Sequence, residues 1–164
     1  MECEFYSEFY EDKTGEIILV TRYVPDEREN LIRMYENFDA ERRCCGLPPV
    51  GRRAIESWID YLDSRGYSFI GKLGDRVIGH ITVVPENDGA EFAIFVHQDY
   101  EDRGIGGELI RFAEKFLLDK GIRKLNAMTE RTNRRALEIY RHLGFRTVKT
   151  DNQHVYLEKI LDEN

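Results

Sequence analysis

A glycine-rich turn in the middle of the chain has the composition of an anion-binding site. Residues 97–107 read HQDYEDRGIGG, and Gly104, Gly106 and Gly107 lie between an apolar run and a segment with helical periodicity. Glycines at a helix start let backbone amides approach a ligand, and the helix dipole stabilises a phosphate there by roughly 0.3 to 2 kcal/mol. Arg103 could add a charge contact. Taken alone, these glycines could equally be structural.

Two familiar phosphate-binding motifs do not account for this turn. A dinucleotide-binding turn needs G-x-G-x-x-G with an acidic residue about twenty positions later, and that spacing is absent. A Walker-type loop, G-x-x-x-x-G-K-[ST], occurs nowhere in the chain. The turn therefore belongs to another class of phosphate site, if it binds phosphate at all.

A second spaced pattern lies nearer the C-terminus. It reads Asn133-Arg-Arg-Ala136-x-x-x-Tyr140-x-x-x-Gly144-Phe145. The seven positions from Asn133 to Tyr140 make nearly two helical turns, so an amide and a phenol should project from one helix face. Both side chains could then meet the same bound molecule.

Together these two patterns resemble the acetyl-CoA signature of the GNAT superfamily of N-acetyltransferases. The family's turn reads Q/R-x-x-G-x-G/A, and its later motif reads N-x-x-A-x-x-x-Y-x-x-x-G-F. Here residues 101–106 form the turn, with Glu101 in place of Gln or Arg. A carboxylate near phosphate is unfavourable, which leaves the tightness of cofactor binding open. The resemblance covers residues 77–161, roughly half of the chain.

The resemblance implies an acyltransferase that moves the acetyl group of acetyl-CoA to a primary amine within a ternary complex. The acceptor would be a protein lysine, an N-terminus or a small-molecule amine. A non-catalytic acyl-CoA sensor or interaction module is the alternative, because a fold does not fix a function. Nucleotide-phosphate binding without CoA is a third possible function.

The arginines at 42, 43, 52 and 53 could bind an acidic acceptor, although a solvated face is expected.

The resemblance also assigns roles to individual residues. In the family the pantetheine arm lies along the strand before the turn. The residues assigned to cofactor binding are Ile94, Phe95, Val96, Asp102, Arg103, Gly104, Ile105, Gly106, Gly107 and Asn133. Tyr140 is the predicted proton donor, because a phenol of pKa about 10 can protonate the departing CoA thiolate at neutral pH.

A general base is also expected. A lysine-like amine of pKa near 10.4 is neutral only about once in 2,500 molecules at pH 7, so a proton must be removed before attack. Glu91 is the candidate, because related enzymes often place a carboxylate on this strand. Glu130 and His97 are alternatives, and family members also use chains of water molecules.

Hydrophobic periodicity predicts the elements that would position these residues. Strands are expected over 16–24, 67–72, 76–84, 90–96, 124–128, 145–150 and 155–161. Helices are expected from Asp26 to near Ala40 and over 53–64, 105–120 and 132–142, with Asp26 and Thr132 as N-caps. This order predicts an α+β domain with a mixed, largely antiparallel sheet of about seven strands and four helices, the acyl-CoA N-acyltransferase (GNAT) fold.

Length and charge suggest how the chain is organised. Its 164 residues suit one domain, which we expect over 16–164. Six acidic residues lie within the first sixteen positions, so residues 1–15 are predicted to be an acidic, flexible arm. The net charge of −7 argues against nucleic acid and anionic membranes as partners and favours cationic ones such as amines.

The remaining predictions concern location, cysteines and oligomeric state. No apolar run approaches the ~20 residues of a membrane span, and no signal segment is evident, so a cytoplasmic protein is expected. Cys3, Cys44 and Cys45 are odd in number and lack metal-ligand spacing, which argues for free buried thiols and against a disulfide framework or a metal site. Dimers are common among similar proteins, so a homodimer is left open.

Overall fold

The computed structural model describes residues 7–42 and 46–162. The chain forms two compact units, one of Met1–Val83 with Ala93–Ala113 and the other of Val84–Phe92 with Glu114–Asn164. All three cysteines lie outside the described residues, so the prediction of free buried thiols stays a prediction. No helix in the described part of the chain is long and apolar enough to cross a membrane.

The first unit is built on an antiparallel meander. Its strands are β1 (Ser7–Glu11), β2 (Ile17–Arg22), β3 (Tyr67–Leu73), the larger part of β4 (Arg76–Glu86) and the second half of β5 (Gly89–Val96), side by side in that order. β2 forms because its β-branched residues alternate between faces, with Ile18 and Val20 buried. β3 and β4 pair from Tyr67–Val83 to Leu73–Arg76, with an irregularity after Gly71.

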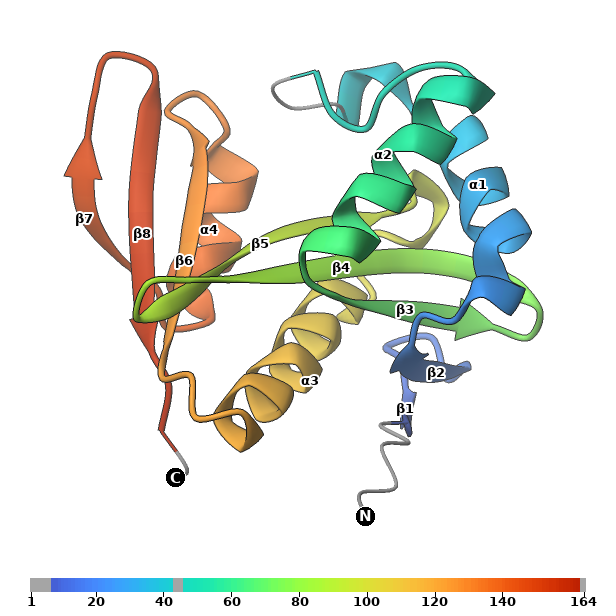
Figure 1. The fold of residues 1–164 in the computed structure, drawn as a ribbon, viewed down its shortest axis with the longest axis horizontal. Coiled ribbons are helices and arrows are strands. Elements are labelled where there is room, and N and C mark those ends of the chain that lie inside the picture. Colours follow the sequence, from blue (N-terminus) through green and yellow to red (C-terminus); the bar gives the residue numbers. More distant parts are fainter. Residues whose placement is uncertain (1–6, 43–45, 163–164) are drawn as a thin grey trace. The chain divides into compact units, whose positions relative to one another are not determined.

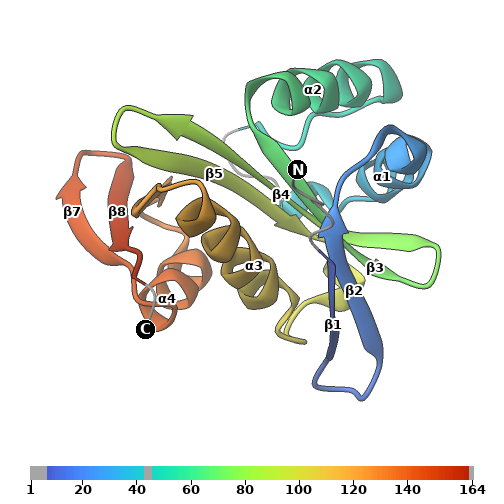
Figure 2. The same ribbon diagram turned by 60° about the horizontal axis from the view of Figure 1, so that its bottom comes forward.

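Helices cover both faces of this meander (Figures 1 and 2). The helical elements are η1 (Pro25–Glu27), α1 (Arg28–Glu36), η2 (Ala40–Arg42), α2 (Arg52–Arg65), η3 (Gln98–Tyr100) and the first half of α3 (Ile105–Asp119). α1 and α2 pack on the face that carries Ile70 and Val77. α3 packs on the opposite face, where the Phe112 ring lies 5.3 Å from that of Phe69.

A chain of buried polar side chains crosses the core under α1. The Tyr35 hydroxyl lies 2.6 Å from His80 Nδ1, and His80 Nε2 lies 3.2 Å from the Thr82 hydroxyl. Thr82 in turn lies 2.8 Å from the Ser68 hydroxyl. Burial of the imidazole lowers the pKa of His80 to about 3. His80 is therefore neutral at physiological pH and is a buried core residue.

The second unit contains the C-terminal strands. It comprises the ends of β4 and β5 at their hairpin, the rest of α3, β6 (Lys124–Glu130), α4 (Arg134–His142), β7 (Arg146–Thr150) and β8 (His154–Ile160). The strand order here is β4-β5-β6-β8-β7. β5 pairs with β6 in parallel at Ala90–Leu125 and Glu91–Asn126. β8 pairs antiparallel with both β6 and β7. The parallel pair predicted around the glycine turn is confirmed.

The predicted α+β class and its four helices are confirmed for the described part of the chain, but the sheet has eight strands there instead of about seven. The additional strand is β1, within the segment expected to be a flexible arm. β1 pairs with β2 along its whole length. Asp12 closes the hairpin, because its Oδ1 accepts hydrogen bonds from the backbone N–H groups of Thr14 and Glu16 at 2.8 and 3.0 Å.

Two helix boundaries differ from prediction. The first helix begins at Arg28, after a turn of 3-10 helix over Pro25–Glu27, and ends at Glu36 instead of near Ala40. Asn37 ends it by donating a side-chain hydrogen bond to the Arg33 carbonyl at 2.9 Å. At the fourth helix the cap is Asn133, not Thr132, because Asn133 Oδ1 accepts from the Ala136 N–H at 3.1 Å.

We expect His80 to make the free energy of unfolding depend on pH. Its pKa is about 3 in the folded chain, below the ordinary histidine value of 6.5, so between these values only the unfolded chain binds the proton. Stability is then fully present above pH 6.5 and falls by about 1.4 kcal/mol per pH unit as the pH drops toward 3. Urea titrations from pH 4.5 to 7.5 should show this slope in the parent and in the exposed-histidine control His142→Gln. His80→Leu should lack it, and an unchanged slope in His80→Leu would refute the assignment.

Candidate active site

The glycine-rich turn leads from β5 into α3 through two left-handed residues. Asp102 has φ of 64° and Gly104 has φ of 89°. Asp tolerates this region better than most residues. At Gly104 a side chain would have room, since no atom lies within 4 Å of where its Cβ would be, so glycine is favoured there by the backbone conformation alone. α3 begins at Ile105, and the first N–H groups of a helix have no intrahelical acceptor. The start of α3 thus supplies backbone N–H groups without helical acceptors, as an anion site requires.

Glu101 has a cationic partner that the sequence did not reveal. Arg42 Nε donates to Glu101 Oε1 at 2.6 Å, and the Glu101 side chain is only 14% exposed. This hydrogen bond raises the pKa of Arg42, so the guanidinium stays charged. Pairing offsets the carboxylate that stands where the family has Gln or Arg, and it reduces the electrostatic cost of a phosphate nearby.

Arg103 braces the same turn against the β1–β2 hairpin. Its Nη1 lies 3.2 Å from Glu16 Oε1 and 3.5 Å from Asp12 Oδ2, and its guanidinium lies 5.0 Å from the Tyr100 ring centroid. A hydrogen bond from the Thr14 hydroxyl is the main cause that lowers the pKa of Asp12, which keeps this carboxylate ionised. The acidic N-terminal segment therefore holds the turn, and a direct contact from Arg103 to a cofactor stays a prediction.

The strand before the turn presents the residues predicted to line a pantetheine arm. Ile94, Phe95 and Val96 are all partly exposed. A Cβ at Gly106 would lie 3.7 Å from Val96 Cγ2 and 3.9 Å from Ile94 Cδ1, so these side chains face the start of α3. Phe95 faces the other way, with its ring 5.3 Å from that of Trp58. Strand, turn and helix start are thus brought together within the first unit.

Glu91, the predicted base, lies in the second unit near the start of β5. Burial raises the pKa of its carboxyl group, and the neighbouring Glu86 raises it further by charge and by a hydrogen bond. Sequence reasoning missed Glu86, which lies between the strands expected over 76–84 and 90–96. A carboxyl group with a raised pKa is a better base at neutral pH than an ordinary one.

Tyr140 and Asn133 lie on α4 in the same unit. The Tyr140 ring is half-buried, 5.7 Å from the ring of Phe92 and 5.6 Å from that of Phe145. Phe92 follows Glu91 directly, so the tyrosine packs next to the strand that carries the predicted base. Asn133 is engaged as the α4 cap through its side-chain oxygen, which fixes the orientation of its amide group.

Of the alternative bases, His97 has both ring nitrogens engaged. Its Nε2 lies 3.2 Å from the Asn37 carbonyl oxygen, and its Nδ1 accepts from the Asp99 N–H at 3.2 Å. These bonds use the neutral imidazole fully, which disfavours His97 as a proton acceptor. Glu130 ends β6, opposite His154. Among the described residues, no group of three or more potential ligands could hold a metal ion.

Comparison with known sequences gives a consistent picture. A family model described as "Acetyltransferase (GNAT) family" matches residues 23–145. A mycothiol acetyltransferase from Saccharomonospora viridis is 31% identical over 109 residues, which are 60% of this chain and 35% of that protein. An acetyltransferase from Yersinia pestis is 36% identical over 62 residues, 38% of this chain and 44% of that protein. The chain thus spans less than half the length of these curated relatives.

Solved structures show the same fold at low sequence identity. The GNAT domain of PAT from S. lividans has a TM-score of 0.82 at 18% identity, covering 95% of this chain and 97% of that one. The PaiA N-acetyltransferase from Thermoplasma acidophilum, solved in complex with coenzyme A, has a TM-score of 0.69 at 21% identity, covering 87% and 98%.

The Arg42–Glu101 pair should control affinity for acetyl-CoA, the ligand that the resemblance implies. Arg42→Gln leaves the Glu101 carboxylate without this partner beside the turn, and we expect the Kd for acetyl-CoA to rise roughly tenfold, about 1.4 kcal/mol. Arg42→Gln combined with Glu101→Gln should restore it. Arg52→Gln, which removes another paired arginine of this unit, is the control. Calorimetry gives the four affinities, and a double variant as weak as Arg42→Gln would contradict this role.

Proposed function

Because the chain belongs to the acetyltransferase (GNAT) family, we propose that it transfers the acetyl group of acetyl-CoA to a primary amine. The family uses acetyl-CoA as its cosubstrate. The observation that carries the proposal is the turn of residues 101–107. It combines left-handed backbone, a helix start and a Glu101 carboxylate that is paired with Arg42. The acceptor would be a protein lysine, an N-terminus or a small-molecule amine.

The residues of the turn fit a diphosphate-bearing cosubstrate. Gly104, Ile105, Gly106 and Gly107 supply backbone N–H donors at the start of a 15-residue helix, whose dipole favours anions. Arg42 and Arg103 balance the carboxylates around them. Ile94, Phe95 and Val96 would offer backbone groups to the amides of the pantetheine arm and to the thioester oxygen, for which a fixed N–H donor lowers the barrier.

Three proton transfers accompany the proposed reaction. The acceptor ammonium loses a proton to Glu91, directly or through water, and the free amine attacks the thioester carbonyl carbon. The carbon–sulfur bond breaks, and the Tyr140 hydroxyl donates a proton to the departing thiolate. The amide nitrogen then gives its second proton to the Tyr140 oxygen, which restores the phenol, and Glu91 releases its proton to water. The products are an acetylated amide and the CoA thiol. Asn133 would bind the cofactor from the start of α4. Its amide oxygen makes the helix cap, so its side-chain NH2 group would make the contact.

Tyr140→Phe tests the proton donor. Loss of a positioned acid typically costs about 10²- to 10⁴-fold in rate, so kcat should fall by that order while KM for acetyl-CoA changes little. Thiol release measured against a panel of amines reports turnover, and Tyr61→Phe, on the exposed surface of α2, is the control. Unchanged turnover would remove Tyr140 from the mechanism. A parent chain that binds acetyl-CoA but acetylates nothing in a broad panel would favour the non-catalytic sensor.

Glu86→Gln tests whether Glu91 is the base. Removing the neighbouring negative charge lowers the pKa of Glu91, so the acid limb of the kcat/KM profile should move to lower pH. Asp88→Asn removes a charge from the same hairpin, where Asp88 pairs with Lys124, and should leave the limb in place. The assignment is overturned if the limb does not move in Glu86→Gln, or if it moves equally in Asp88→Asn.

A further inference from the structure

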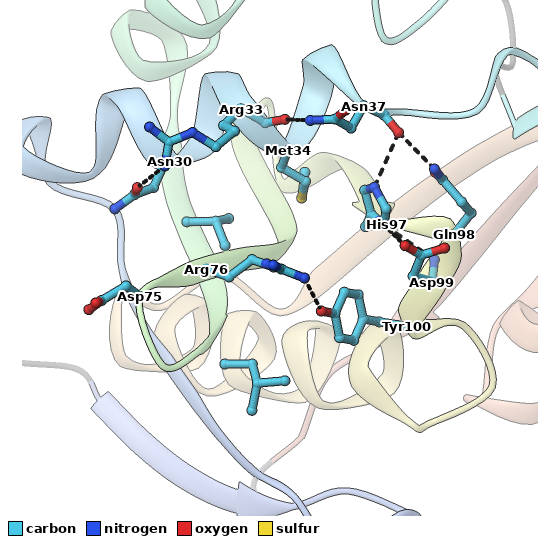
Figure 3. Close-up of a pocket in the computed structure, with 12 residues that line it drawn as sticks. Asn30, Arg33, Met34, Asn37, Asp75, Arg76, His97, Gln98, Asp99 and Tyr100 are labelled. Carbon is cyan, nitrogen blue, oxygen red and sulfur yellow. Dashed lines mark hydrogen bonds and ion pairs between the residues drawn. The ribbon is translucent and has the colours of Figure 1, made fainter.

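A cavity of about 760 Å³ lies in the first unit, beside the segment that leads into the glycine-rich turn. Its walls come from α1, the β3–β4 turn with the start of β4, and η3 with the preceding residue (Figure 3). Met34, Val77 and Tyr100 give it buried apolar surface. Its size is typical of small-molecule sites, which measure roughly 300–1,000 Å³. Neither residues 94–96 nor residues 101–107 line it, so it is separate from the proposed acetyl-CoA site.

Two arginines line this cavity from different elements. Arg33 comes from α1, and its Nη1 donates to Asn30 Oδ1 at 3.3 Å. Arg76 comes from the start of β4, and its Nη1 donates to the Tyr100 hydroxyl at 2.8 Å. Within residues 7–42 and 46–162, neither guanidinium has a carboxylate partner, whereas Arg28 pairs with Asp60 in the same unit. Two guanidiniums that form no ion pair with a described carboxylate, at one cavity, favour an anionic ligand.

Two carboxylates limit how much negative charge that ligand can carry. Asp99 lines the cavity near His97, with its side chain 73% exposed. Asp75 also lines it, although Figure 3 shows its side chain directed away from Arg76. These groups would repel a polyphosphate more than a singly charged group. An apolar wall beside two guanidiniums therefore fits a small carboxylate with an apolar body. If the ligand also has an amino group, the Asp99 carboxylate could accept a hydrogen bond from it.

Side-chain contacts connect the cavity to the glycine-rich turn. The Tyr100 hydroxyl accepts from Arg76, and the same ring lies 5.0 Å from the guanidinium of Arg103 in the turn. The Asn37 carbonyl oxygen on the other wall lies 2.7 Å from Gln98 Nε2, in η3. A ligand held by Arg33 and Arg76 would fix both walls and therefore the segment that enters the turn.

We propose that this cavity is a regulatory site for a small carboxylate, whose binding orders η3 and increases affinity for acetyl-CoA. The carboxylate accepts hydrogen bonds from Arg33 and Arg76, and the apolar body lies against Met34 and Val77. Ordering the turn in advance lowers the entropy cost of binding the cosubstrate, so the two ligands bind cooperatively. The coupling to acetyl-CoA rests on the proposed function, whereas the site itself does not.

Direct binding to the full chain without acetyl-CoA tests the site. Calorimetry would compare 4-methylpentanoate with 4-methylpentan-1-ol, which has the same carbon skeleton and no charge, with leucine, which adds an amino group, and with inorganic phosphate. We expect the carboxylates to bind and the alcohol to bind at least tenfold more weakly. Tighter binding of leucine than of 4-methylpentanoate would indicate a contact to Asp99. Equal binding of the alcohol, tighter binding of phosphate, or no binding of either carboxylate would overturn the proposal.

Variants locate the binding to the two arginines. Arg33→Gln changes an exposed helix position and should fold normally, and it should weaken carboxylate binding about tenfold. Arg76→Lys keeps the positive charge and should weaken binding less than Arg76→Gln. Arg146→Gln removes an exposed arginine of the second unit and should have no effect. Undiminished binding in Arg33→Gln combined with Arg76→Gln would place the ligand elsewhere and overturn the assignment.

The coupling is measured on the parent chain with both ligands present. Saturating carboxylate should lower the Kd for acetyl-CoA about fivefold, and acetyl-CoA should lower the Kd for the carboxylate by the same factor. Carboxylate binding that leaves the acetyl-CoA affinity unchanged would refute the regulatory role. Failure of the parent to bind acetyl-CoA at all would instead refute the proposed function, because the carboxylate titration alone establishes the site.

Discussion

The path of the chain from β5 into α3 is the constraint on which the proposed site depends. Asp102 and Gly104 both take left-handed backbone conformations there, and for Asp102 this conformation carries a cost that other contacts must offset. Those contacts come from three segments distant in sequence. Arg42 holds Glu101 from η2, the β1–β2 hairpin holds Arg103, and the end of α1 holds η3 through the Asn37 carbonyl. These segments converge on the turn and favour this conformation of its backbone.

The electrostatics of the turn follow from the same convergence. An acidic residue where the family has Gln or Arg would repel phosphate if it stood alone. The Arg42 guanidinium pairs with it, and the first backbone amides of α3 have no helical acceptor and can serve an anion. The acidic N-terminal segment acts similarly, since Asp12 and Glu16 are counter-charges to Arg103. Charges that look unfavourable along the sequence are thus compensated in space.

The second unit has its own organising contact, between Phe92 on β5 and Tyr140 on α4. Their rings meet edge to face at 5.7 Å, with Phe145 beside Tyr140, so the proposed acid has a defined position relative to the strand of Glu91. Glu86 then tunes that carboxyl group through charge and a hydrogen bond. The proposed acid is thus held against the strand that carries the proposed base, through the residue next to Glu91.

The sequence by itself determined the α+β class, the four helices, the parallel pair around the glycine turn and the likeness to a GNAT acetyltransferase. These follow from local periodicity, glycine placement and short-range spacing, which the chain carries wherever it folds. Only the tertiary structure decided that Ser7–Glu11 is a strand, that Arg42 pairs with Glu101, and that Glu86 acts on Glu91. Arg42 lies 59 positions from Glu101, and no periodic pattern encodes a contact of that range. The cavity between α1 and η3 belongs to the same class, because its two arginines meet one space only after α1 packs on the sheet.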